Sequence, residues 1–71
     1  MKLGYLAKSI EIEGDIRLSL WGDKDEELEV VYLRNVYGLA GEKAVQNWKN
    51  KTVKYMFAGT DGFLHIEVKE D

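Results

Sequence analysis

The segment DKDEELEVVYLRNVYG, residues 23–38, decides the fold, because its pattern is compatible with both a helix and a strand. As a helix it would begin with Asp23 as the N-cap, carry acidic residues in its first turn and end before Gly38. As a strand it would use residues 30–33, VVYL, a run of β-branched and aromatic side chains. The β-branched run favours the strand, which would pair with residues 16–20 across a short acidic turn.

The C-terminal third of the chain predicts a β-hairpin. Apolar and polar residues alternate on both sides of the sequence GTDG at 59–62, whose composition is typical of a turn. A four-residue loop there would pair Phe57 with Leu64 and turn one apolar face, which includes Tyr55, toward the core.

Residues 10–20 alternate in the same way around a second turn-forming sequence. A three-residue loop at 13–15 would pair Ile12 with Ile16 and form another hairpin. One long strand bent at Gly14 keeps the same apolar face and is the alternative.

A short helix is predicted between these parts, because Ala44, Val45 and Trp48 lie on one helical face that ends near Asn50. The expected fold is therefore α+β, a small curved antiparallel sheet of about five strands with one short helix, in the order β-β-β-α-β-β. A helix at 23–38 would change the order to β-β-α-α-β-β. The first order is also that of the five-stranded OB barrel, a likeness of topology that no motif supports.

Length and composition indicate a single globular domain over residues 1–71. Hydrophobic residues make up 45% of the chain and charged residues 32%, a balance too apolar for disorder and too interrupted for a membrane span. The chain has no cysteine, and charged side chains interrupt its first residues where a signal peptide needs an apolar run. We therefore expect a cytoplasmic protein without a membrane association.

Residues suited to catalysis or metal binding are few. His65 is the only histidine and there is no cysteine, so a zinc site would depend on carboxylates. No local signature of a nucleophilic triad is present, and a domain of this size has difficulty enclosing a substrate pocket. We expect neither an enzyme nor a metal ion nor a cofactor.

Charge is segregated along the chain. Residues 1–34 carry five basic and eight acidic side chains, residues 35–54 four and one, and residues 55–71 one and four. The formal net charge of −3 counts against a protein dedicated to duplex nucleic acid, which would be basic.

The densest single-sign feature is an acidic cluster at residues 23–29. Its alternating carboxylates resemble the first half of a calcium loop, but Leu28 and Arg34 stand where that loop needs glycine and glutamate. Exposed charges contribute little to folding, whereas a surface that steers a basic protein partner would use them. The first hypothesis is a non-enzymatic protein-interaction or regulatory module, whose candidate contacts are Asp23, Asp25, Glu26, Glu27 and Glu29.

A second hypothesis is a single-stranded nucleic-acid-binding module of OB-like design, because lysines and aromatic residues are interleaved at 42–57. Strand alternation counts against it, since it places Tyr55 and Lys54 on opposite faces. The candidate residues are Lys43, Trp48, Lys49, Lys51 and Lys54. A third hypothesis is a binder of a small phosphate ligand at residues 38–43, GLAGEK, although this sequence departs from a Walker loop. The oligomeric state is left open.

Overall fold

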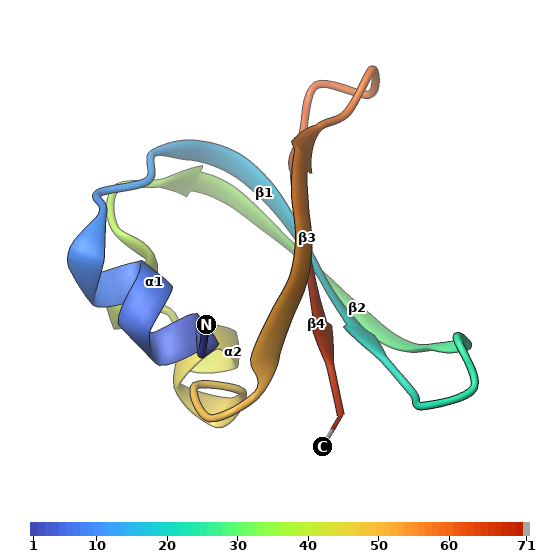
Figure 1. Cartoon of the computed structure of the whole chain (residues 1–71). Coiled ribbons are helices and arrows are strands. Elements are labelled where there is room, and N and C mark those ends of the chain that lie inside the picture. The colour runs from blue at the N-terminus through green and yellow to red at the C-terminus, as the bar shows by residue number, and fades with distance from the viewer. Residues whose placement is uncertain (71) are drawn as a thin grey trace.

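The computed structural model describes residues 1–70, in which two short helices pack on one side of a four-stranded sheet (Figure 1). The α+β class is confirmed, but the sheet has four strands instead of five, and the order is α-β-β-α-β-β. The elements are α1 (Leu3–Ser9), β1 (Gly14–Trp21), β2 (Glu27–Val36), the 3₁₀ turn η1 (Leu39–Gly41), α2 (Lys43–Asn47), β3 (Thr52–Ala58) and β4 (Leu64–Lys69).

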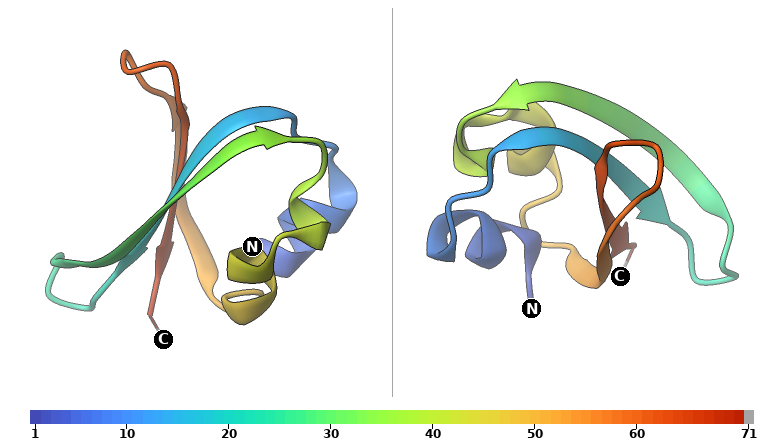
Figure 2. Two further views of the ribbon diagram at one scale, coloured as in Figure 1. Left: turned by 180° about the vertical axis from the view of Figure 1, so that it is seen from behind. Right: turned by 90° about the horizontal axis from the view of Figure 1, so that it is seen from above.

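The sheet is mixed, with the spatial order β2-β1-β4-β3. The hairpins β1–β2 and β3–β4 are antiparallel, whereas the central strands β1 and β4 run parallel, from Ile16 beside Leu64 to Trp21 beside Lys69. The sheet is open and strongly twisted (Figure 2), so the expectations of a purely antiparallel sheet and of an OB-like barrel are wrong. β4 can lie beside β1 and parallel to it because the chain between these two strands crosses over through α2.

Residues 3–9, for which no element was predicted, form helix α1. The predicted hairpin around 13–15 and its alternative, a long strand bent at Gly14, are both wrong, because residues 10–13 form no strand and only the second half of the segment does, as β1. Leu3, Leu6 and Ala7 are buried at a spacing of three and four residues, which is the period of a helix and not of a strand. Ile10, which the hairpin would have buried, is 54% exposed. The prediction of a strand within 23–38 is confirmed by β2, and the predicted short helix is α2.

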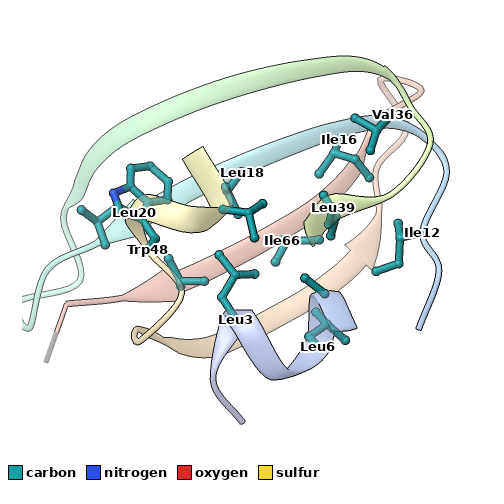
Figure 3. Packing of buried hydrophobic residues seen from close by; sticks show 13 residues of the cluster. Leu3, Leu6, Ile12, Ile16, Leu18, Leu20, Val36, Leu39, Trp48 and Ile66 are labelled. Carbon is teal, nitrogen blue, oxygen red and sulfur yellow. The ribbon is translucent and has the colours of Figure 1, made fainter. Parts of the chain in front are cut away.

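The core lies between the two helices and the sheet face that they cover, which we call the helix face (Figure 3). Ile16, Leu18 and Ile66, from the two central strands, are fully buried there. The helices and their flanking segments contribute Leu3, Leu6, Leu39, Val45 and Trp48. Neither helix in the described residues has the length and apolarity that crossing a membrane demands.

The C-terminal hairpin exists, but its register differs from the prediction. Its loop has five residues, 59–63, and Phe57 pairs with His65 and not with Leu64. A bulge between Val53 and Tyr55 shifts the alternation of β3 by one residue. A shift of one residue moves side chains to the opposite face of a sheet, so Tyr55 and Phe57 are exposed on the face without helices.

The register leads to a prediction about stability. Ile66→Ala removes a fully buried side chain and should lower the free energy of unfolding by about 2–5 kcal/mol. Phe57→Ala should cost less than about 1.5 kcal/mol, because that ring is 45% exposed. Urea unfolding of dilute protein measures both values. An equal cost for the two substitutions would show that Phe57 is buried and that the register is wrong.

Candidate interaction face

The sheet face opposite the helices, which we call the outer face, carries aromatic and cationic side chains in rows that cross the strands. One row runs from Tyr32 on β2 through Arg17 and His65 to Phe57 on β3, since the register pairs these residues in turn. Tyr32 and Phe57 are about half exposed. Both edges of the row therefore present an aromatic ring to solvent.

Trp21, the last residue of β1, covers Ser19 on the outer face. Its indole Nε1 donates a hydrogen bond of 3.0 Å to the Oγ of Ser19, two residues back on the same face of β1. Ser19 is completely buried although it points away from the core, because the indole lies across it. The hydroxyl and the indole N–H satisfy each other, as buried polar groups require.

Phe63, in the loop between β3 and β4, joins the two hairpins across the outer face. Its ring meets that of Tyr32 edge to face, with 5.2 Å between the centroids. The guanidinium of Arg34, on the same strand as Tyr32, lies 4.8 Å from the centroid of the Phe63 ring. Such edge-to-face and cation–π contacts fix the orientation of rings that solvent would otherwise leave mobile.

Arg17 is held at the centre of its row by two partners. Its Nε donates to the Tyr32 hydroxyl at 3.2 Å, and its Nη2 donates to a carboxylate oxygen of Glu27 at 3.1 Å. The hydrogen bond to Tyr32, followed by the interaction with Glu27, raises the pKa of the Arg17 guanidinium. These two hydrogen bonds hold the guanidinium against Tyr32.

Lys54 occupies the other end of the outer face. Its Nζ lies 5.1 Å from the ring centroid of Trp21 and 5.5 Å from that of Tyr55. The same ammonium forms an ion pair with Asp25, from the β1–β2 loop. This hydrogen bond lowers the pKa of Asp25 and raises that of Lys54. The Lys54 ammonium thus contacts both the acidic β1–β2 loop and the aromatic rings of the outer face.

His65 and Asp61 set the geometry of the β3–β4 loop. The His65 ring stacks on Phe57 with 4.8 Å between centroids, and its Nε2 is 2.9 Å from a carboxylate oxygen of Asp61. The other carboxylate oxygen accepts the backbone N–H of Phe63 at 3.0 Å. The Phe63 N–H, and then the His65 ring, hold the pKa of Asp61 below its usual range.

Charge on the outer face is nearly balanced. Arg17, Lys54 and His65 are each paired with a carboxylate, and these carboxylates come from Glu27, Asp25 and Asp61. Arg34, by contrast, forms no ion pair among residues 1–70. The face is therefore aromatic and close to neutral, with a cation at one end and the acidic loop at the other.

The structure divides the acidic cluster that the sequence singled out. Asp25 and Glu27 hold Lys54 and Arg17, so these two carboxylates have a structural role that local charge density did not reveal. Glu26 accepts the backbone N–H of Lys24 and closes the loop. Asp23 and Glu29 are exposed.

The residues proposed for nucleic-acid contact do not form one surface. Trp48 is only 7% exposed and belongs to the core, so its ring cannot stack on a base. Lys43 belongs to α2, and Lys49 lines a groove of about 430 Å³ between α1 and α2, on the helix side. Lys51 precedes β3, and Lys54 is the one candidate on the outer face.

The outer-face residues that the sequence did not single out as candidates are Arg17, Trp21 and Tyr32. Arg17, Ser19 and Trp21 share one parity on β1, opposite the buried Leu18 and Leu20. That alternation was visible in the sequence, but it did not show that Tyr32 and His65 lie on either side of Arg17.

The remaining sequence candidate, the loop at 38–43, lies on the helix side of the sheet. In the loop at 38–43, Leu39 is completely buried in the core. Across residues 1–70 no group of three metal-ligating side chains comes together. Comparison of the chain with protein-family models, with curated proteins and with solved structures finds no match.

The lowered pKa of Asp61 predicts how stability depends on pH. A carboxyl group with a folded-state pKa below its unfolded value stabilises the fold at neutral pH, and this contribution is lost as the pH falls through the folded pKa. Asp61→Asn keeps an acceptor for Phe63 but cannot titrate. We expect its unfolding free energy to fall less than that of the wild type between about pH 6 and about pH 2.5, by urea unfolding. Equal losses in both proteins would contradict the assignment.

Proposed function

We propose that this chain is a non-enzymatic protein-interaction or regulatory module of the cytoplasm, which binds a protein partner through its outer face. One observation carries the proposal: three aromatic side chains, each about half exposed, gather on the sheet face that no helix of residues 1–70 covers. They are Tyr32, Tyr55 and Phe57.

The arrangement of these rings suits binding better than exposure alone would. Tyrosine, tryptophan and arginine are the residues that most often dominate protein interfaces. Tyr32 and Arg17 are adjacent here, and Trp21 lies on the same face of β1 as Arg17. Hydrogen bonds and cation–π contacts already fix the rings, so binding would cost little side-chain entropy.

The charges at the two ends of the outer face indicate the chemistry of the partner. Its contact surface would carry apolar groups for the rings of Tyr32 and Phe57 and a basic side chain facing Asp23, which is exposed in the β1–β2 loop. A carboxylate would face Arg34 at the other end. Such complementary ends give orientation and faster association more than affinity.

Single-stranded nucleic acid is the second candidate, because exposed rings on a four-stranded sheet can stack bases. The charge of the face counts against it. Asp25 and Glu27 pair with Lys54 and Arg17, the cations that would otherwise contact phosphates. Asp61 adds a further carboxylate beside His65, and Glu67 adds another in the same row as Tyr55. Protein is therefore the favoured partner.

The proposal predicts where a partner crosslinks. A photo-reactive benzoylphenylalanine at position 32 or 55 should capture one and the same protein in the cells that express the chain. The same probe at position 5 or 37 is the matched control, because Tyr5 and Tyr37 are at least as exposed but lie outside the outer face. Capture of one protein from all four positions, or from the control positions alone, would contradict docking on the outer face.

A titration distinguishes the two candidates. Trp21 lies on the outer face and Trp48 is buried, so a bound base should quench Trp21 and leave Trp48 unchanged. We expect no change in fluorescence with single-stranded DNA or RNA of about 12 nucleotides at low salt. Salt-sensitive quenching that Trp21→Phe abolishes and Tyr32→Ala weakens would replace the protein partner with a nucleic acid.

A further inference from the structure

The last four residues of β3, Tyr-Met-Phe-Ala at 55–58, are all exposed, although they form a strand at the edge of the sheet. Tyr55 and Phe57 lie on the outer face. Met56 and Ala58 lie on the helix face, opposite Ile66 and Leu64, at the end of the sheet that α1 and α2 do not reach (Figure 1). Proteins usually protect such an edge with charges, proline or a covering segment.

The first half of β3 has that protection and the second half lacks it. The Val53 N–H donates to the Met1 carbonyl, and the Lys51 carbonyl accepts the Leu3 N–H, so the N-terminal segment covers the start of the edge. The bulge at Lys54 then interrupts the strand. Residues 55–58 have neither a covering segment within residues 1–70 nor a charged side chain.

Backbone alternation shows which groups of this edge are available. The Gly59 N–H donates to the Phe63 carbonyl, so the backbone groups of Gly59 face the β4 side of the ladder. Hydrogen-bonded and non-hydrogen-bonded pairs alternate along an antiparallel ladder. The N–H and C=O of Phe57 therefore face β4, whereas those of Met56 and Ala58 point away from the sheet.

We propose that this edge binds a second copy of the chain by antiparallel pairing of the two β3 strands about a twofold axis at Phe57. Met56 of each copy then exchanges two backbone hydrogen bonds with Ala58 of the other copy. This pairing uses the outward-pointing N–H and C=O groups of both Met56 and Ala58, four groups on each strand. A register centred on Met56 would bring Ala58 against the bulged Lys54, and one centred on Ala58 would bring Met56 against the loop at Thr60.

The side chains fit this register. The two Phe57 rings lie next to each other on the outer face, in the close spacing of a non-hydrogen-bonded pair. On the helix face the long Met56 lies beside the short Ala58 of the other copy. Lys54 of one copy comes beside the end of the other strand at Thr60 and Asp61, so a cation meets the acidic end of its neighbour.

The fold leaves room for this pairing, because the loop end of the β3–β4 hairpin stands clear of the helices in both views (Figures 1 and 2). The dimer would contain one continuous sheet of twice the width, in which the outer faces of the two copies lie side by side. The inference does not rest on the proposed function, although Phe57 belongs to both surfaces. Strand pairing uses the backbone edge of β3, whereas partner binding uses the rings of the outer face, among which Tyr32 lies on β2 at the opposite edge of the sheet.

Cysteine crosslinking tests the register directly. The chain contains no cysteine, so a disulfide in a single-cysteine variant can only join two copies. In Phe57→Cys the two Cα atoms would be about 4.5 Å apart, within the range of a disulfide. In Tyr55→Cys, the matched control, they would be separated by about 13 Å along the strands, which a disulfide cannot span.

We expect Phe57→Cys to form a disulfide-linked dimer at least about tenfold faster than Tyr55→Cys under mild oxidation, a difference that separates contact from collision. Equal rates, or a faster reaction at position 55, would overturn the proposal. Far-UV circular dichroism verifies that both variants are folded.

Charge reversal across the twofold axis gives an independent readout. A small interface of this kind is weak, so sedimentation equilibrium should cover protein up to about 1 mM. Phe57→Lys and Phe57→Glu should each be monomeric, because like charges would meet, and their mixture should recover a dimer. A monomeric wild type at that concentration, or a mixture that stays monomeric while wild type dimerises, would overturn the pairing about Phe57. Crosslinking at position 32 is unaffected by either result, so the proposed function is tested separately.

Discussion

The parallel pairing of β1 with β4 is the interaction on which the rest of this structure depends. It brings Ile16 and Leu18, from the first third of the chain, against Leu64 and Ile66, from the last, and forms the centre of the sheet. Parallel neighbours need a crossover, and here it runs through β2, η1, α2 and β3. Because α2 crosses on the same side on which α1 docks, both helices cover one face of the sheet.

The outer face follows from this constraint. Two short helices suffice for one layer over the core, and in residues 1–70 no other segment covers the second face of the sheet. The exposed rings there are not left unsupported, since Arg17 holds Tyr32, Lys54 bridges Trp21 and Tyr55, and carboxylates balance the cations. The face is thus ordered before any partner arrives, which is the property that lowers the entropic cost of binding.

Local patterns in the sequence predicted the elements better than their arrangement. The C-terminal hairpin and α2 each have a clear period, and the β-branched run at 30–33 favoured the strand β2. No element was predicted for the residues of α1, and Ile10 and Ile12, which follow it, resemble strand alternation. The parallel pairing was not predictable, since it joins segments about fifty residues apart through a crossover and leaves no local signal. One bulge at Lys54 places Tyr55 and Phe57 on the outer face, whereas the sequence predicted both rings in the core. The sequence therefore did not reveal the exposed rings of the candidate interaction face. Charge density located the acidic loop but could not show which of its carboxylates face cations.

We propose that the protein functions through its outer face. The most direct test compares side-chain oxidation in the purified protein with side-chain oxidation of the protein inside the cell. The four tyrosines are all between 55% and 80% exposed, and they divide into Tyr32 and Tyr55 on the outer face and Tyr5 and Tyr37 elsewhere. The account predicts that Tyr32 and Tyr55 are protected in the cell while Tyr5 and Tyr37 react as they do in the purified protein. Protection of Tyr5 and Tyr37 with Tyr32 and Tyr55 still reactive would contradict it.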